Sequence, residues 1–310
     1  MKVKFMRIVT CILLVGIIFR MIICSGKLLN PRWTDRSINA VEAFHSLPEN
    51  SIEVLIYGSS HAWKGIDPRV MYEQYGIKTY NYSGNWQKIN TTALFFKDSI
   101  RTQSPKIILI ETFLVSSVLK DSDLNGEIYY TKAIDMFDGK IQYLKQCFGN
   151  DKVRWLSYYF PLIMFHSNWN SIDEENFAEG VTQEQYLEQL GYERGNSIEP
   201  VEIMDFEEFE QYELDDEAVI VLDDIVKICK EQDIKIIFYT VPYQGEFGYY
   251  KAMKDYAVAN GCVYLNLFQN MEEIGIDETT DFRDATHLND NGAKKIASYL
   301  GKYIIDNFNV

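Results

Sequence analysis

Residues 52–61 read Ile-Glu-Val-Leu-Ile-Tyr-Gly-Ser-Ser-His, and the architecture can be worked out from this run. A short apolar segment that stops at a glycine is typical of a buried strand, and the small polar residues after it suit a turn into a helix. We therefore predict a first strand that ends at Gly58, with Ser60 just beyond its carboxyl end.

From about residue 40 onward, helical and strand patterns alternate, which is typical of a parallel sheet with covering helices. We predict further strands over residues 78–82, 106–112, 234–241 and 262–268, and helices over 67–75, 90–100, 215–231, 246–260 and 290–307. The buried stripe of the last helix is predicted to be Ala293, Ile296, Ala297, Leu300 and Ile304. Five parallel strands with right-handed crossovers predict an α/β fold, an open doubly wound sheet that binds ligands at the carboxyl ends of its strands.

Residues 115–212 interrupt this alternation, and we expect a long aromatic-rich insertion within one α/β domain of residues 30–310. The segment is either an elaborate insertion or a small lid. Its rings could stack on the sugars of a glycan, or they could form the core of the insertion, which is the more common role. His166 and Trp169 are the candidates for substrate contact, because they lie among aromatic and polar residues.

The first 29 residues differ in kind from the rest. Lys2, Lys4 and Arg7 precede an uncharged, mostly aliphatic run over residues 8–19, which resumes after Arg20. A basic flank before an apolar run is typical of an export signal whose basic end stays in the cytoplasm. We predict an uncleaved signal anchor, a single transmembrane helix within residues 1–29, with the rest of the chain outside the cytoplasm. A cleaved signal peptide and a buried core helix are the alternatives.

The formal net charge of −15 argues against polyanionic partners such as nucleic acid, which need a basic surface. Nine carboxylates with no basic residue lie between Glu202 and Glu217. Because they are not spaced like a calcium-binding loop, we expect a solvated surface there. The five cysteines have neither metal-ligand nor disulfide-framework spacing. We expect no metal site, no structural disulfide and no cofactor.

A second short motif, Asp284-Ala285-Thr286-His287, precedes the last predicted helix. A serine hydroxyl is a weak nucleophile at neutral pH, so it needs a base within hydrogen-bond reach and a third group that holds the base in the right tautomer. Asp284 and His287 are close enough in sequence to supply the last two groups, provided that the fold returns them to Ser60. We therefore predict Ser60, His287 and Asp284 as the catalytic residues.

Each of these residues has a structural alternative, which for His287 is a purely structural histidine. Ser60 could cap the helix that follows the first strand, since serine is common at that position. Asp284 could cap the last helix, although Asn289 and Asp290 are better placed to do so. Asp281 is the reserve carboxylate for His287.

With this order of elements, the chain resembles the SGNH/GDSL hydrolase superfamily over roughly residues 50–114 and 215–307. Three blocks carry the resemblance, namely residues 58–61, residues 81–85 (Asn-Tyr-Ser-Gly-Asn) and residues 284–289. The resemblance implies that Ser60 is the nucleophile, that the last block carries the acid and the base, and that the backbone N–H of Gly84 binds the oxyanion.

The chain departs from the superfamily pattern at two places. Ser59 stands where aspartate is usual, and Glu111-Thr112 stands where an asparagine usually donates a hydrogen bond to the oxyanion. A carboxylate cannot donate unless it is protonated. The oxyanion is therefore left to the backbone N–H groups of Ser60 and Gly84, or to Asn85.

Two residues beside these blocks are further candidates. Trp86 follows the second block directly, and we expect it to contact the substrate. His61 follows Ser60, and we expect it to have a positional role, with its ring turned into the sheet or helix instead of toward the substrate.

The missing asparagine and the predicted anchor move the resemblance toward anchored cell-surface members, such as the D-alanine-transfer protein of teichoic acid modification and the alginate O-acetylation proteins. That branch implies a membrane-bound O-acyltransferase as a partner. We expect an extracytoplasmic serine acyltransferase or carboxylic-ester hydrolase acting on O-acyl groups, acetyl above all, of a cell-surface polysaccharide or teichoic-type polymer. A secreted hydrolase or lipase of small esters, and a non-catalytic scaffold for the acyltransferase, are the alternatives.

Overall fold

The computed structural model describes residues 2–30, 32–119, 126–172, 174–177 and 180–309. Five strands form one parallel sheet in the order β2-β1-β3-β4-β5. Their bounds are β1 Val54–Tyr57, β2 Thr79–Asn81, β3 Ile107–Glu111, β4 Lys235–Thr240 and β5 Val263–Asn266. Each strand lies inside its predicted range, so the expected α/β fold with five parallel strands is confirmed.

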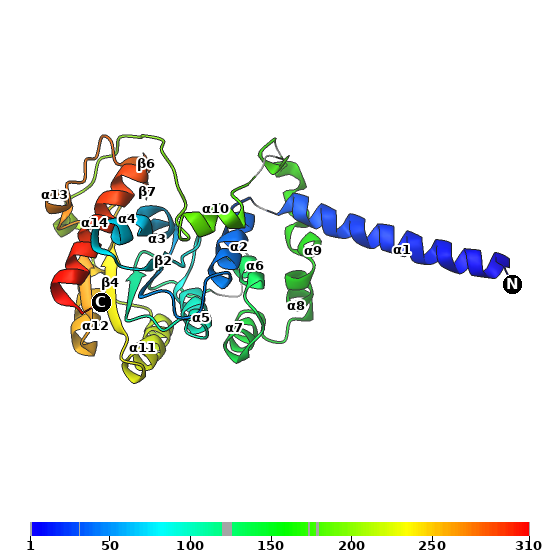
Figure 1. The fold of residues 1–310 in the computed structure, drawn as a ribbon, viewed down its shortest axis with the longest axis horizontal. Helices are drawn as coiled ribbons and strands as arrows, with labels where there is room; N and C mark the ends of the chain where they lie inside the picture. The colour runs from blue at the N-terminus through cyan, green and yellow to red at the C-terminus, as the bar shows by residue number, and fades with distance from the viewer. Residues whose placement is uncertain (1, 31, 120–125, 173, 178–179, 310) are drawn as a thin grey trace.

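Helices cover both faces of the sheet (Figure 1). One layer packs α5, α11 and α12 against the strands, and the other packs α3, α4 and α14. The bounds are α3 Ser60–Gly65, α4 Pro68–Tyr75, α5 Ile89–Ser99, α11 Asp216–Glu231, α12 Tyr250–Asn260, α13 Met271–Ile274 and α14 Asp290–Asn307, with α2 Arg32–His45 preceding the sheet. β1 pairs with β2 on one side and β3 on the other, so the strand order reverses at β1. Its carboxyl end is therefore the expected ligand position of a doubly wound sheet.

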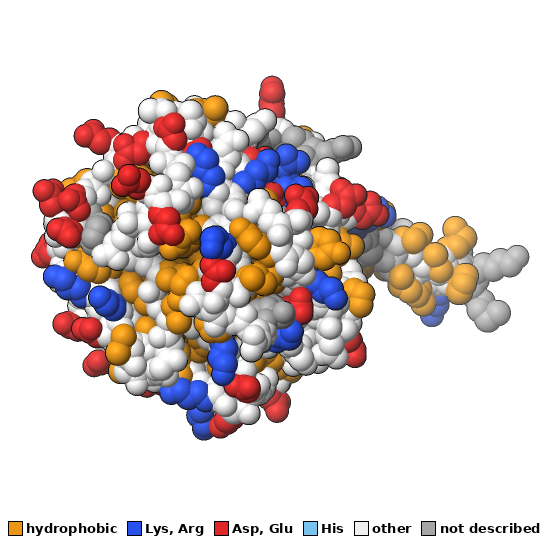
Figure 2. Space-filling view, turned by 60° about the vertical axis from the view of Figure 1, so that its left-hand side comes forward, with side chains coloured by type: hydrophobic (Ala, Val, Ile, Leu, Met, Phe, Trp, Pro, Cys, Tyr) orange, Lys and Arg blue, Asp and Glu red, His pale blue; other side chains and the backbone are white. Residues whose placement is uncertain are grey.

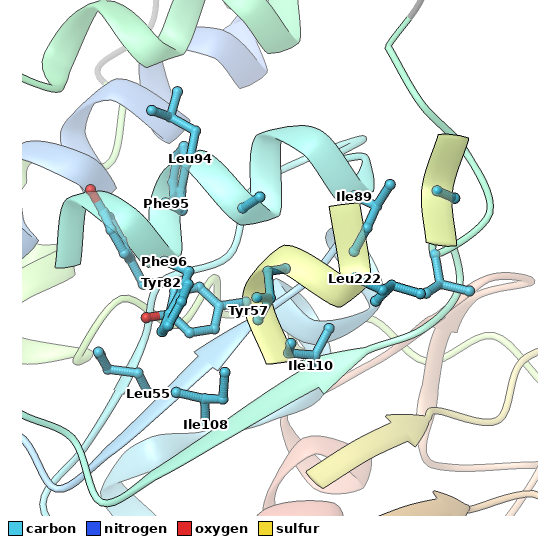
Figure 3. Packing of buried hydrophobic residues seen from close by; sticks show 14 of the residues in the cluster. Leu55, Tyr57, Tyr82, Ile89, Leu94, Phe95, Phe96, Ile108, Ile110 and Leu222 are labelled. Atoms are coloured by element: carbon cyan, nitrogen blue, oxygen red, sulfur yellow. The ribbon is translucent and has the colours of Figure 1, made fainter. Parts of the chain in front are cut away.

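The larger core lies between the sheet and the layer of α5 and α11. Figure 3 shows Tyr57 and Ile110 of the strands facing Phe96 and Leu222 of these helices, and all four side chains are at most 1% exposed. The rings of Tyr57 and Phe96 meet edge to face, with centroids 6.2 Å apart. Strands buried on both faces need continuous apolar sequence, which explains why β1 and β3 carry almost none of the alternation of a half-exposed strand.

The last helix agrees with its prediction. The five residues of the expected stripe, Ala293, Ile296, Ala297, Leu300 and Ile304, are all fully buried. The Asn289 side chain caps α14, because its oxygen accepts hydrogen bonds from the N–H groups of Asn291 and Gly292.

The helix predicted over residues 246–260 begins later, at Tyr250. The carbonyl of Gly248 accepts a hydrogen bond from the N–H of Tyr212, and a Cβ at Gly248 would lie 2.3 Å from the Tyr212 ring. This contact with a remote segment holds residues 246–249 in an irregular turn, so the start at residue 246 was wrong.

The segment predicted as an insertion is mostly helical. It contains α6 Gly126–Tyr130, α7 Asp138–Phe148, α8 Lys152–Tyr159, α9 Pro161–Phe165 and α10 Gln183–Glu188, with short 3-10 turns η1 Thr131–Ala133, η2 His166–Ser171 and η3 Glu174–Phe177 between them and η4 Phe206–Glu208 near the end. Ile128, Tyr130 and Leu144 belong to the same buried cluster as Leu94 of α5. The first part of this segment therefore extends the main core.

The N-terminal helix α1 Lys2–Leu29 extends from the domain as a single rod (Figure 1). Its side chains from Lys4 to Ser25 are exposed, and the stretch Lys4–Gly26 is long and apolar enough to cross a membrane. The same features fit a membrane anchor and a signal sequence.

Candidate active site

The loop after β1 holds Ser60 at the carboxyl edge of the sheet. Gly58 has φ of +150°, and a Cβ there would lie 2.5 Å from the Cβ of Glu111, so only glycine fits this turn. Ser59 is the N-cap of α3, and its Oγ accepts the N–H of His61. Ser59 therefore takes the helix-capping role that was the alternative for Ser60, and the Ser60 hydroxyl stays available on the first turn of α3.

Glu111, at the end of β3, stabilises this loop by hydrogen bonds. Its carboxylate is buried at 3% exposure and accepts hydrogen bonds from the Ser59 hydroxyl (2.8 Å) and from the N–H of Phe113 (2.6 Å). Burial raises the pKa of Glu111 to about 7, although these hydrogen bonds oppose the shift. The residue in the place of the third-block asparagine thus supports the backbone around Ser59.

A short antiparallel pair, β6 Phe282–Asp284 and β7 His287–Leu288, positions the acid and the base. The Nδ1 atom of His287 lies 2.9 and 3.0 Å from the two carboxylate oxygens of Asp284. The same carboxylate accepts the N–H groups of Thr286 and His287, which closes the turn around it. This arrangement favours the tautomer with the proton on Nδ1, so Nε2 is free to accept.

The structure brings the two remote motifs into contact. The Nε2 atom of His287 lies 2.8 Å from the Oγ of Ser60, although 227 positions separate the two residues. Ser60 is partly exposed, so its hydroxyl is both hydrogen-bonded and reachable from solvent. Hydroxyl, imidazole and carboxylate form one continuous chain of hydrogen bonds.

The ionisation of these groups fits a base that is neutral at rest. Burial lowers the pKa of His287 to about 4, and the nearby Lys64 cation adds to this effect, while Asp284 opposes it. Burial alone would raise the pKa of Asp284, but hydrogen bonds from His287 and Thr286 outweigh it and lower the pKa to about 2. At neutral pH, Asp284 is therefore ionised and His287 can take up a proton.

The predicted oxyanion donors differ in whether they already have a hydrogen-bond partner. The N–H of Gly84 donates to the carbonyl of Gly58 at 3.2 Å, so its expected role requires that this bond be given up. Among the described residues, the backbone N–H of Ser60 and the side-chain amide of Asn85 have no hydrogen-bond partner. The N–H of Ser60 and the amide of Asn85 can therefore bind an oxyanion without giving up a hydrogen bond, whereas the N–H of Gly84 cannot.

The predicted substrate contacts divide into two groups. Trp86 lies on the loop after β2 at the carboxyl edge, with 57% of its surface exposed and φ of +57°. A bulky residue in this backbone region is uncommon and is often found at functional sites.

His166 and Trp169 are not brought to this edge. Both belong to η2, which follows α9 and packs against α1, on the opposite side of the domain from β7 (Figure 1). The expectation that they contact the same substrate as Ser60 was wrong, because this part of the chain packs on the N-terminal helix instead of over the sheet.

The ring of His61 forms part of the wall behind the base. It stacks on Phe113 with centroids 3.9 Å apart, and its edge contacts Tyr243 and His287. The side chain is 2% exposed, which agrees with the expected positional role. Phe113 and Tyr243 were not identified from the sequence, since a single aromatic residue after a strand carries no distinctive signal.

Two cations near the site were also missed. Burial lowers the pKa of Lys64 to about 8, with Arg283 adding to the shift, and both cations also lower the pKa of His287. Neither forms an ion pair with a carboxylate within the part of the chain that the structure describes. The spacing of Lys64, four residues after Ser60 in a helix, was the available signal.

The remaining candidates lie away from the chemistry. Asp281, the reserve carboxylate, is buried against Lys295 at 2.6 Å. No group of three His, Cys, Asp or Glu side chains that could hold a metal occurs among the described residues. A cavity of about 650 Å³ lies at the amino ends of β3 and β4, the edge of the sheet opposite Ser60. Figure 2 shows acidic side chains scattered over one face of the domain instead of gathered at one place.

Comparisons with known proteins give distant likenesses in structure only. No protein-family model matches the sequence, and no curated protein matches it. The chain is similar to the structure of a proposed acylhydrolase from Bacteroides fragilis NCTC 9343, with TM-score 0.41 and 13% identity over 85% of this chain and 92% of that one. It is also similar to a GDSL-like lipase from Bacteroides thetaiotaomicron VPI-5482, with TM-score 0.41 and 12% identity over 88% of this chain and 98% of that one. Both likenesses are too distant to carry an argument about activity.

Proposed function

We propose that this protein is an SGNH-type serine acyltransferase or esterase, anchored in the membrane with its α/β domain outside the cytoplasm. The observation that carries the proposal is the continuous hydrogen-bonded chain of Ser60, His287 and Asp284 at the carboxyl edge of the sheet. The motif blocks around these residues support the superfamily, and the apolar helix α1 supports the anchored branch.

In the proposed reaction, the Ser60 Oγ attacks the acyl carbonyl carbon while its proton passes to Nε2 of His287. Asp284 stabilises the imidazolium, and the N–H of Ser60 with Asn85 binds the oxyanion. The imidazolium then protonates the departing alcohol, which leaves an acyl-Ser60 ester. Water or a sugar hydroxyl attacks this ester and gives its proton to His287, and the imidazolium then protonates the departing Oγ of Ser60, which restores both residues. None of these steps requires a cofactor.

The substrate that we propose is a small O-acyl group, acetyl above all, on a cell-surface polysaccharide or teichoic-type polymer. Lys64 and Arg283 favour the anionic members of this group. Although the whole chain is acidic, these two cations lie near His287, and no carboxylate of the described residues is within ion-pair distance of either one. A phosphate or carboxylate of the polymer would pair with them directly, whereas Asp284 and Glu193 act on Lys64 only from a longer distance.

The test is turnover of a chromogenic acetyl ester by the purified full chain. We expect Ser60→Ala to abolish it, while Ser298→Ala, a partly exposed serine on α14, leaves it unchanged. Thermal melting of both variants checks that they are folded. Transfer is then separated from hydrolysis by adding anionic or neutral glycans and measuring acylated product. Equal turnover by the wild type and Ser60→Ala would overturn the proposal.

A non-catalytic scaffold for a membrane-bound O-acyltransferase is the second candidate. Two observations favour it, namely that Glu111 stands in the place of an oxyanion donor and that the N–H of Gly84 is already engaged. A folded wild type without serine-dependent turnover, but with acyltransferase activity of the partner that depends on this chain, would select the scaffold.

The third candidate, a secreted hydrolase of small esters, requires that α1 be removed. The last turn of α1 is built into the domain, since Gly26 is buried against Pro161 and Leu162, and Leu29 packs with Tyr129 and Phe165. This packing supports retention of the helix. The mass of the mature N-terminal peptide decides between a retained and a cleaved helix.

A further inference from the structure

The side of the domain from which α1 emerges carries an unusual set of exposed apolar side chains. We name it the apolar platform and define it as Val153, Leu156 and Tyr159 of α8, Ile163 of α9, Trp169 of η2 and Phe177 of η3. Their exposed fractions range from 37% for Ile163 to 71% for Phe177. Val153, Leu156 and Tyr159 are spaced three apart and share one face of α8. Tyr158, on the opposite face of this helix, is buried.

The platform is joined to the candidate membrane span. A Cβ at Gly26 would lie 2.8 Å from the backbone nitrogen of Leu162, so α9 and the end of α1 are in direct contact. The side-chain amide of Asn168 donates to the carbonyl of Leu29, and that of Asn176 donates to the carbonyl of Leu28. η2 and η3 are therefore tied to α1 at the point where the apolar stretch ends.

The direction of α1 places the apolar platform beside a membrane that α1 spans. Figure 1 shows α8 and α9 on the side of the domain from which α1 extends, while α3 and β7 lie on the other side. A bilayer that contains Lys4–Gly26 has its outer boundary near Gly26, where α9 packs. Surfaces beside the end of a span meet the headgroup region, where tryptophan and tyrosine are enriched.

We propose that the apolar platform lies in the headgroup region of the bilayer that α1 spans, and holds the domain at a fixed tilt with Ser60 facing away from the membrane. Apolar side chains on one face of a helix bind this region by burial against the acyl chains. Lys152, which is exposed at the start of α8, can approach lipid phosphates. The inference rests on the anchor of the proposed function and not on the chemistry of Ser60.

Lipid contact accounts for features that solvent exposure leaves unexplained. Exposed apolar patches often mark interaction sites, and these six side chains lie on α8, α9, η2 and η3, elements that contact one another or the end of α1. Other exposed apolar residues lie elsewhere on the domain, such as Ile220 of α11 and Val258 of α12. Ile220 and Val258 are as exposed as Val153, and they provide matched control positions.

The test uses the full chain in nanodiscs whose lipids carry a fluorescence-quenching label just below the headgroup. We expect Trp169→Phe to lower the quenchable part of the tryptophan emission by about two-fold or more. Trp86→Phe removes a ring of similar exposure at the carboxyl edge, and we expect it to leave the quenchable part unchanged. Equal effects of the two substitutions, or no quenching at all, would overturn the proposal. Absence of quenching is also the result expected if the platform binds a protein partner instead of lipid.

A second pair of variants does not depend on removing a tryptophan. We expect the double substitution Val153→Asp and Leu156→Asp to reduce the quenching of Trp169, because two carboxylates lift α8 from the acyl chains, while Ile220→Asp on α11 leaves it unchanged. Ser60→Ala should be quenched like the wild type. Normal quenching without acetyl-ester turnover would therefore reject the proposed enzyme activity but support the membrane contact of the platform. Turnover without quenching would support the enzyme activity and reject the membrane contact.

Discussion

The carboxyl edge of the sheet and the apolar platform differ in how their side chains are held. At the edge, Ser60 and His287 are fixed by short hydrogen bonds between strand ends, and Glu111 is buried beneath them. On the platform, the side chains of Leu156 and Trp169 are 48% and 66% exposed. Fixed polar geometry suits a reaction at one bond, whereas an exposed apolar surface suits contact with a fluid partner such as lipid.

The largest expected effect lies at the edge. Replacing Asp284→Asn removes the charge that orients and stabilises the His287 imidazolium, so we expect kcat on an acetyl ester to fall on the order of 10³- to 10⁴-fold. Exposed Asp233→Asn, after α11, is the control, and we expect it to retain wild-type kcat. A fall of less than about ten-fold for Asp284→Asn would mean that Asp284 is not the partner of the base.

Alanine substitutions at two glycines test how tightly the turn before Ser60 is packed, compared with the turn between α7 and α8. Gly58→Ala places a Cβ 2.5 Å from Glu111 in a turn with φ of +150°, so we expect a loss of roughly 2–4 kcal/mol in the free energy of unfolding. Gly149→Ala, between α7 and α8, has open space and φ of +53°, and we expect about 1 kcal/mol. Chemical denaturation measures both, and equal losses would contradict the tight turn before Ser60.

The pH dependence of the free energy of unfolding tests whether the buried Glu111 is protonated in the folded state. The Glu111 carboxyl, with its pKa raised to about 7, keeps its proton in the folded state up to about pH 7, whereas the unfolded chain loses it near the ordinary glutamate pKa of 4.5. The folded state therefore binds more protons between these values, and stability falls as pH rises through this window, by up to roughly 3 kcal/mol. We expect Glu111→Gln to remove this part of the fall. A curve for the variant parallel to that of the wild type would show that Glu111 is ionised without cost.

The smallest effect concerns the base. Because burial and the nearby cations lower the pKa of His287 to about 4, kcat/KM should stay high down to about pH 4 and fall below it, when the imidazole is protonated. Lys64→Met removes a cation that opposes protonation, so its acid limb should move to higher pH, by less than about one unit. Lys152→Met on α8 should not move the limb. A shift of the acid limb to lower pH in Lys64→Met would contradict the proposed effect of Lys64 on the pKa of His287.

The same contrast explains what the sequence could predict. Strand ends and tight turns are local, so Ser60, Asp284 and His287 were identified from their motifs and from the rule that parallel strands end at one edge. His166 and Trp169 were misplaced because their position depends on packing against α1, more than a hundred residues away. Local patterns do not encode such contacts.

The role of Glu111 shows a second limit. The sequence indicated an anomaly in the third block, but the carboxylate turns toward Ser59 only because Gly58 has no side chain at the point of contact. The engagement of Gly84 by the carbonyl of Gly58 likewise follows from the close approach of two loops. Both facts depend on distances between segments, which spacing along the chain cannot give.

Covalent trapping of the nucleophile tests the proposed relay most directly. The full chain is treated with a fluorophosphonate, and the modified peptide is identified by mass spectrometry. We predict a single stoichiometric adduct on Ser60, absent from Ser60→Ala and strongly slowed in His287→Ala. An unmodified Ser60 in the folded protein, or labelling that proceeds equally well without His287, would contradict the proposal that these residues form a working nucleophile and base.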